Sequence, residues 1–149
     1  MNNSHDILIS VEERHASNML AGRKTVELRR KPLNIPTGTR VWVYSKLPRG
    51  EIQALAIVEE VVADAPKEIW KTYGAKSAIS KKEFDAYFAD TRAGYAIVFE
   101  EVKPLAPILS LASIREKISH FQPPQFFKRL SQSGPELAFF ETALASPAE

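Results

Sequence analysis

Several features are missing from this chain of 149 residues, and each absence excludes a class of protein. There is no cysteine, which excludes disulfides and cysteine-based metal sites. No apolar run approaches the ~20 residues that a membrane-spanning helix needs. The first residues, Met-Asn-Asn-Ser-His-Asp, lack the basic-then-apolar pattern of a signal peptide. We therefore expect a cytoplasmic protein with no membrane partner.

Motifs that hold metals or cofactors are also missing. The three histidines, His5, His15 and His120, do not have the spacing of metal ligands. No glycine-rich loop is present to bind phosphate, and no serine lies in a nucleophile elbow. The sequence therefore predicts neither a metal nor a cofactor, and it gives no indication of the oligomeric state.

The charge is small overall but unevenly distributed. A net charge of +2 does not indicate a protein that coats duplex nucleic acid. Glu27 is nevertheless the only acid between Arg14 and Glu51, a stretch that contains eight Lys or Arg residues: Arg23, Lys24, Arg29, Arg30, Lys31, Arg40, Lys46 and Arg49. Such a basic face suits a local contact with phosphate. It equally suits solvated strand edges, where Lys and Arg discourage edge-to-edge pairing.

The pattern of apolar residues predicts an α+β protein with a small mixed barrel, peripheral helices and a helical C-terminal extension. Strands are expected near residues 7–11, 25–30, 41–44, 52–62 and 95–102. Helices are expected near residues 11–21, 64–73, 80–88, 111–118 and 135–144, with Asp64 and Ser80 as N-caps. We expect residues 1–149 to form a single domain, in which a barrel over 7–105 is covered by an extension over 106–149.

The octet at residues 22–29 is the most informative stretch. Gly22 can adopt the positive φ that ends a helix, and strand spacing follows it. Because side chains alternate along a strand, Val26 and Leu28 would face a core, while Glu27 and Arg29 would point to the other side. Lys24 lies at the junction. A lysine, a carboxylate and a guanidinium are thus gathered on one rigid element.

This octet, Gly-x-Lys-x-x-Glu-x-Arg, resembles the signature of the ASCH family, a branch of the PUA-like barrels. Further similarity lies in the order of the segments around it, namely residues 7–9, 38–45, 54–62 and 94–99. The resemblance covers about residues 7–105. It implies a PUA-like barrel with a cleft beside the octet that holds a nucleobase or the end of an RNA.

The resemblance makes Lys24, Glu27 and Arg29 the first candidates for ligand binding, with Lys24 and Glu27 as catalytic residues if the protein is an enzyme. Glu27 would accept from an exocyclic amine, and the two cations would contact carbonyl oxygens or phosphate. A simple surface ion pair is the alternative. Since both charges would face away from the core, we expect Lys24→Ala and Glu27→Ala to leave the fold intact.

Three further residues are candidates for ligand binding. Tyr44 and Ser45 end the third strand, and Tyr95 begins the closing strand. Either tyrosine would stack on a base or, equally, lie half-buried with its hydroxyl hydrogen-bonded.

The segment Pro123-Pro124-Gln125 has two interpretations. The amide of Gln125 would reach a base, although the prolines more simply turn the chain so that nearby phenylalanines can pack.

Some ASCH relatives remove the acetyl group from N4-acetylcytidine, using a lysine, a threonine three residues later and a glutamate from a helical insertion. Lys24 matches this pattern, but Glu27 occupies the threonine position, and the expected insertion position near Ser77 is not acidic. We therefore expect no such hydrolysis.

The functional prediction is an ASCH-domain protein that binds RNA, single-stranded nucleic acid or a nucleotide-like small molecule, with a regulatory purpose. A metal-independent hydrolase acting on RNA or a modified nucleoside is the first alternative. A protein-interaction module that uses the proline-rich segment at 123–126 is the second.

Overall fold

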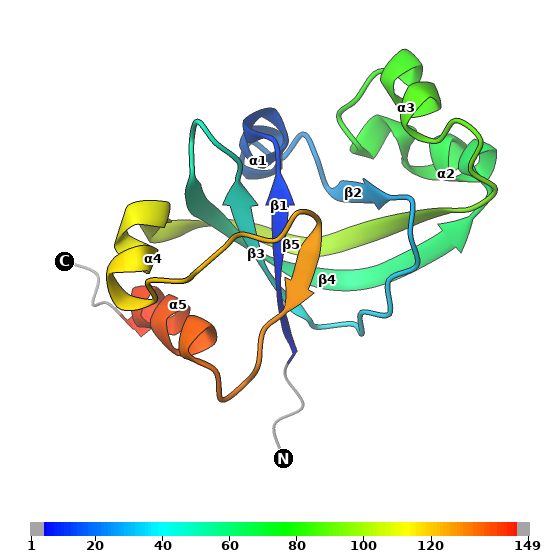
Figure 1. Ribbon diagram of the computed structural model, residues 1–149. Coiled ribbons are helices and arrows are strands. Elements are labelled where there is room, and N and C mark those ends of the chain that lie inside the picture. Colours follow the sequence, from blue (N-terminus) through cyan, green and yellow to red (C-terminus); the bar gives the residue numbers. More distant parts are fainter. Residues whose placement is uncertain (1–4, 146–149) are drawn as a thin grey trace.

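The computed structural model describes residues 5–145, which form one curled mixed sheet with helices around it (Figure 1). The sheet has the strand order β2-β5-β4-β3-β1-β6, with β1 and β3 parallel and every other neighbouring pair antiparallel. Its strands are β1 (Asp6–Val11), β2 (Val26–Arg29), β3 (Arg40–Ser45), β4 (Glu51–Asp64), β5 (Gly94–Ser110) and β6 (Phe127–Arg129). The predicted α+β fold, a small mixed barrel with peripheral helices, is confirmed, and the curled sheet forms half of a barrel.

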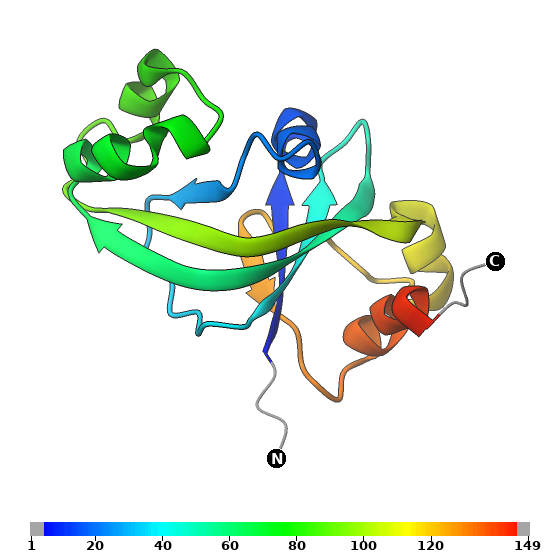
Figure 2. The same ribbon diagram turned by 180° about the vertical axis from the view of Figure 1, so that it is seen from behind.

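The long strands β4 and β5 run the length of the molecule and give the sheet its curvature (Figure 2). Their pairing is interrupted by register shifts, for example between Ile57 and Val58. Such bulges bend a strand and increase its twist. The curvature closes the sheet around a core built from β1, β3, β4, β5 and helix α1 (Glu13–Leu20).

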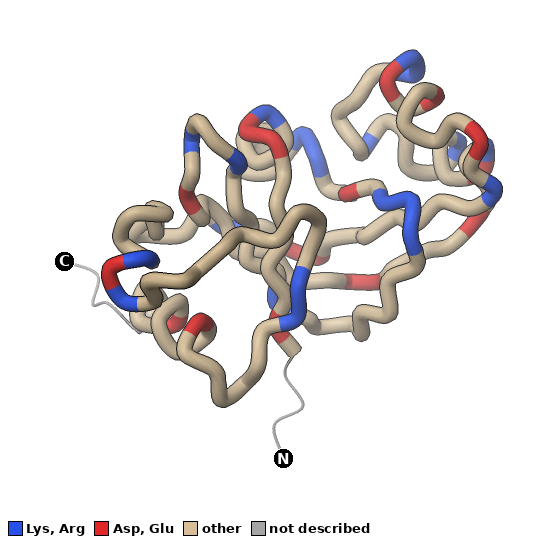
Figure 3. Tube along the Cα trace, in the orientation of Figure 1, with Lys and Arg blue, Asp and Glu red and all other residues tan. Residues whose placement is uncertain are grey.

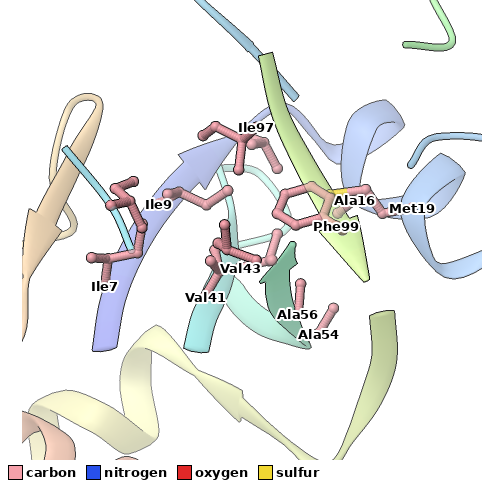
Figure 4. Packing of buried hydrophobic residues seen from close by; sticks show 13 residues of the cluster. Ile7, Ile9, Ala16, Met19, Val41, Val43, Ala54, Ala56, Ile97 and Phe99 are labelled. Carbon is pink, nitrogen blue, oxygen red and sulfur yellow. The ribbon is translucent and has the colours of Figure 1, made fainter. Parts of the chain in front are cut away.

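Branched aliphatic residues fill this core, as Figure 4 shows. Ile7 and Ile9 of β1 face Val41 and Val43 of β3, because parallel pairing places them in register. Met19 packs beside Phe99 from the inner face of α1. Helix α1 ends where Gly22 adopts a φ of +80°, as the sequence predicted.

Two helices and a short 3-10 turn, inserted between β4 and β5, cover one end of the sheet. They are α2 (Pro66–Tyr73), η1 (Gly74–Lys76) and α3 (Lys81–Tyr87). Val26 and Leu28 pack against Ile69 and Phe84 of this insertion, so the core that these two β2 residues face is the helical one. The opposite side of β2, which carries Glu27 and Arg29, therefore faces the barrel.

Of the two predicted N-caps in this insertion, the structure contains one. Ser80 caps α3, since its hydroxyl accepts from the Glu83 backbone N–H at 3.1 Å. Asp64 does not cap α2, because the strand continues to Asp64 and Ala65 occupies the N-cap position. The Asp64 carboxylate accepts instead from the adjoining Ala65 N–H at 2.8 Å.

The C-terminal segment packs at the opposite end of the sheet through α4 (Leu111–Lys117) and α5 (Pro135–Ala145), as Figure 1 shows. Phe121 and Phe140 share a core cluster with Trp42. This segment departs from the prediction in two respects. Strand β5 continues to Ser110, past the start of the C-terminal extension that was expected at residue 106. Strand β6 was not predicted, because three residues are too few to show an alternating strand pattern.

Candidate functional site

A cavity of about 610 Å³ opens between helix α1, strand β2, the loop after β3, and helix α3. The segment before β6 closes one side of it. The lining residues are Ser10, Val11, Glu12, Glu13, Arg14, His15, Lys24, Glu27, Leu28, Arg29, Lys46, Leu47, Pro48, Ile79, Glu83, Tyr87, Gln125 and Phe126. Four cations and four carboxylates are among them, so the wall offers both donors and acceptors.

Lys24, Glu27 and Arg29 form a linked set of charges in the cavity wall. The Lys24 Nζ lies 3.4 Å from Oε1 of Glu27 and donates to the backbone carbonyl of Ser77 at 2.7 Å. A terminal nitrogen of Arg29 lies 2.8 Å from the other Glu27 oxygen. Only 2% of Lys24 and 7% of Glu27 is exposed, so the pair is buried and not a surface ion pair.

The physical cause of this burial is the position of β2. In the antiparallel pairing of β2 with β5, Glu27 lies opposite Ile97, a residue of the barrel core. Directly opposed residues point to the same face of a sheet. The polar face of β2 therefore turns toward the barrel interior beside α1.

Two opposing effects set the pKa of Glu27. Burial raises the pKa of this carboxyl, but the positive charges of Arg29 and Lys24 outweigh burial and hold its pKa below the ordinary value of 4.5. Glu27 is thus a carboxylate at neutral pH, able only to accept. The Nε–H of Arg29 is buried without a hydrogen-bond partner, which leaves one donor available.

His15 brings an imidazole to the same cavity. Burial lowers its pKa below the ordinary value of 6.5, and the nearby Lys24 ammonium lowers it further. The Nδ1 atom has no hydrogen-bond partner, while Nε2 lies 3.7 Å from a Glu12 oxygen. A neutral imidazole with a free nitrogen can act as a proton acceptor.

Carboxylates line the side of the cavity between α1 and α3. Arg14 joins the two helices by donating to Glu83 at 2.8 Å, and it also pairs with Glu12. These carboxylates raise the pKa of Arg14 above its ordinary value. Ligand atoms of Glu12, His15 and Glu83 lie within 4.8 Å of one another. A metal ion held by this set would compete with Arg14 for the carboxylates.

The structure brings together three of the six predicted site residues, Lys24, Glu27 and Arg29. Ser45 and Tyr44 do not line the cavity, because Ser45 is fully buried and Tyr44 belongs to the C-terminal core cluster. Tyr95 lies opposite Arg29 in the β2–β5 pairing but is also absent from the cavity wall.

Several residues that line the cavity were not predicted from the sequence, because they come from segments that lie far apart along the chain. The insertion does supply a carboxylate, Glu83, although it lies on α3 and not near Ser77, where spacing placed it. Gln125 and Phe126 line the cavity, whereas packing was the favoured interpretation of their segment. His15 carried no signal, since its neighbours in space are far along the chain.

Comparison with known proteins places the chain in a family. Residues 6–116 match the model of a domain of unknown function, DUF365. The chain belongs to this family. An ASCH domain-containing ribonuclease of Zymomonas mobilis subsp. mobilis is 29% identical over 120 residues, which span 80% of each chain. The chain thus carries an ASCH domain, as the octet indicated.

Two solved structures resemble the fold of this chain. A crystal structure of a mutant of the ZmASCH protein from Zymomonas mobilis has a TM-score of 0.84 and 25% identity, covering 92% of this chain and 96% of that one. Human THYN1, solved in complex with DNA containing 5-methylcytosine, has a TM-score of 0.57 and 12% identity, with coverage of 96% and 99%. This second likeness shows the shared fold alone. None of the described helices of the ASCH domain is long and apolar enough to cross a membrane.

Proposed function

We propose that this ASCH-domain protein binds single-stranded RNA, with one nucleotide in the cavity beside β2. The main observation in support of this proposal is the buried Lys24–Glu27–Arg29 set, in which the Nε–H of Arg29 has no hydrogen-bond partner. A buried donor without a partner is costly, and a ligand acceptor would satisfy it. The similarity to a protein named as a ribonuclease makes RNA the favoured ligand.

The size and chemistry of the cavity suit a nucleotide. A volume of about 610 Å³ lies within the ~300–1,000 Å³ typical of small-molecule sites. A nucleobase has donors and acceptors on its edge, and the wall offers a carboxylate next to two cations. Arg29 and Lys46 would contact phosphate or a base carbonyl, and Glu27 would accept from an amine.

Basic residues beside the cavity supply a path for the flanking phosphates. Arg30 and Lys31 follow β2 directly, and Figure 3 shows this stretch of Lys and Arg positions after the single acid of β2. Side chains of this kind bind the phosphate backbone without reading its sequence.

Fluorescence anisotropy with a labelled single-stranded RNA of ten nucleotides tests the proposal. Arg29→Gln should weaken binding at least about tenfold, because it removes a buried, charged donor. Arg92→Gln, at an exposed position outside the cavity, is the matched control and should leave binding unchanged. Equal affinities for the two variants would contradict the proposal.

RNA cleavage is the second candidate function, and the free Nδ1 of His15 favours it. A neutral imidazole could take the proton from a ribose 2′-hydroxyl, whose oxygen then attacks phosphorus. The P–O5′ bond breaks, a 2′,3′-cyclic phosphate forms, and the leaving oxygen takes a proton from water.

Gel analysis of labelled RNA tests the cleavage candidate. His15→Asn should abolish cleavage, while His120→Asn, at an exposed position outside the cavity, should not. The assay should be run with a chelator and with added Mg²⁺, because Glu12 and Glu83 lie beside His15. An intact RNA under both conditions would leave binding as the function.

A further inference from the structure

Exposed apolar side chains gather at the polar cavity. Among the described residues, six large apolar side chains are exposed, and three of them line this cavity: Leu47 at 72%, Tyr87 at 37% and Phe126 at 53%. Single exposed apolar residues need no explanation, but a group at the mouth of a charged cavity indicates contact with a ligand.

Phe126 is the most suitable of the three for contact with a flat ring. Its backbone is fixed, because its carbonyl accepts from the Ser10 N–H at 3.1 Å and the Ser10 hydroxyl donates to the Pro124 carbonyl at 2.6 Å. Two consecutive prolines, Pro123 and Pro124, further restrict the segment. The ring is thus held on an ordered support while half of the residue stays in contact with solvent.

Two cations lie near Phe126, one at its ring and one at its backbone carbonyl. The Lys31 ammonium lies 5.6 Å from the ring centroid of Phe126. A terminal nitrogen of Arg29 lies 3.5 Å from the Phe126 carbonyl, so the same arginine contacts both Glu27 and the segment that carries the ring. The platform and the charged cavity wall are therefore next to each other.

We propose that Phe126 is a stacking platform for the nucleobase that neighbours the one in the cavity. This inference rests on the proposed function and specifies its ligand as at least two consecutive unpaired nucleotides. Every base has a π-face, so an aromatic ring stacks on any of them. Lys31 would neutralise the phosphate of the stacked nucleotide. Bases are free to separate in this way only in single strands.

The charges around the ring favour nucleic acid over an apolar protein segment. An apolar segment would desolvate the Lys31 ammonium without pairing it, which is costly. A nucleotide offers an apolar face to the ring and an anion to the cations, so its two parts match the two kinds of side chain.

The test measures RNA affinity for Phe126 variants by anisotropy, using a labelled single-stranded decamer. Phe126→Ala should weaken binding between about fivefold and 100-fold, the range for loss of one base–aromatic stack. Phe126→Trp should retain affinity, and Phe126→Leu should bind like the alanine variant, because it keeps apolar area but no aromatic ring. Leu144→Ala, at a position 45% exposed and outside the cavity wall, is the control and should bind like the wild type.

A second series separates stacking from a structural effect. Decamers with a single abasic site, placed at each position in turn, are titrated against the wild type and Phe126→Ala. At the position that stacks, removal of the base should weaken wild-type binding and should cancel the effect of Phe126→Ala. An unchanged effect at every position would overturn the platform.

These binding measurements also distinguish failure of the stacking proposal from failure of the proposed RNA-binding function. If the wild type binds RNA and Arg29→Gln weakens binding while Phe126→Ala does not, the platform is wrong and the cavity proposal stands. If Phe126→Leu binds like the wild type, the ring contributes apolar area and not stacking, which also overturns it. Absence of RNA binding by the wild type would overturn both.

Discussion

The ammonium of Lys24 and the carboxylate of Glu27 lie 3.4 Å apart, and less than a tenth of either residue is exposed. Taking two charges out of water is costly, and their mutual attraction offsets that cost only when further partners complete the set. Here the Ser77 carbonyl accepts from Lys24, and Arg29 contacts Glu27. The fold thus keeps two charges inside the protein, in the wall of the cavity.

Glu27→Ala should destabilise the protein by about 3–5 kcal/mol, the usual cost of leaving a buried charge unpaired. The sequence-based expectation that this substitution leaves the fold intact assumed that Glu27 faces away from the core, whereas the polar face of β2 is buried. Urea unfolding followed by circular dichroism measures the effect. Glu101→Ala is the control, since Glu101 is 52% exposed and pairs only loosely with Lys103 at 3.9 Å. That variant should change the free energy of unfolding by no more than about 1 kcal/mol.

Stability should fall at acidic pH because of Glu27. Its folded-state pKa is below 4.5 while its unfolded-state pKa is near that value, so the unfolded chain binds the proton more readily. The contribution of Glu27 is fully present above pH 4.5 and is lost as the pH falls through the folded-state pKa. The free energy of unfolding of Glu27→Gln should depend less on pH below 4.5 than that of the wild type. Parallel curves for the two proteins would contradict the assigned pKa direction.

Most of the fold could be predicted from the sequence because its helices and strands depend on residues that are close together along the chain. Gly22 ends α1, Ser80 caps α3, and the strand alternation at Val26 and Leu28 correctly separated an apolar from a polar face. The sequence could not predict whether the polar face of β2 is buried. The alternation of side chains along a strand separates its two faces but does not show what packs against each of them. Glu27 looked exposed for this reason.

The rest of the site depends on contacts between distant segments. Glu83 lies 69 residues from its partner Arg14, and Phe126 lies 97 residues from Arg29. No spacing rule covers such separations. Tyr44 was expected at the site because it ends a strand near β2, but its side chain joins the cluster of the C-terminal helices. The cluster could not be foreseen without knowing where α5 packs.

Glu83→Gln should strengthen RNA binding. Glu83 places a negative charge in the cavity wall beside Glu12, and removing it raises the local positive potential. We expect a gain in affinity of about twofold to fivefold at low salt, measured by anisotropy. The matched control is Asp85→Asn on the same helix, which removes the same charge outside this cavity. A larger gain for the control would show that net charge, not the cavity, governs binding.

The protein should not release acetate from N4-acetylcytidine. Both oxygens of Glu27 are engaged by Lys24 and Arg29, and a carboxylate replaces the hydroxyl group that the acetyl-removing relatives have at this position. Incubation with the nucleoside followed by chromatography for cytidine checks this expectation. Sustained turnover would show that Lys24 works with another partner, such as Thr25 or water.

The salt dependence of RNA binding tests the central claim most directly. A labelled single-stranded RNA decamer is titrated with the wild-type protein at rising salt concentration. If Arg29, Lys31 and Lys46 contact phosphates, the logarithm of the association constant should fall linearly with the logarithm of salt, with a slope of about −2. Arg29→Gln should make that slope shallower. The absence of binding at low salt, or an affinity indifferent to salt, would contradict the account.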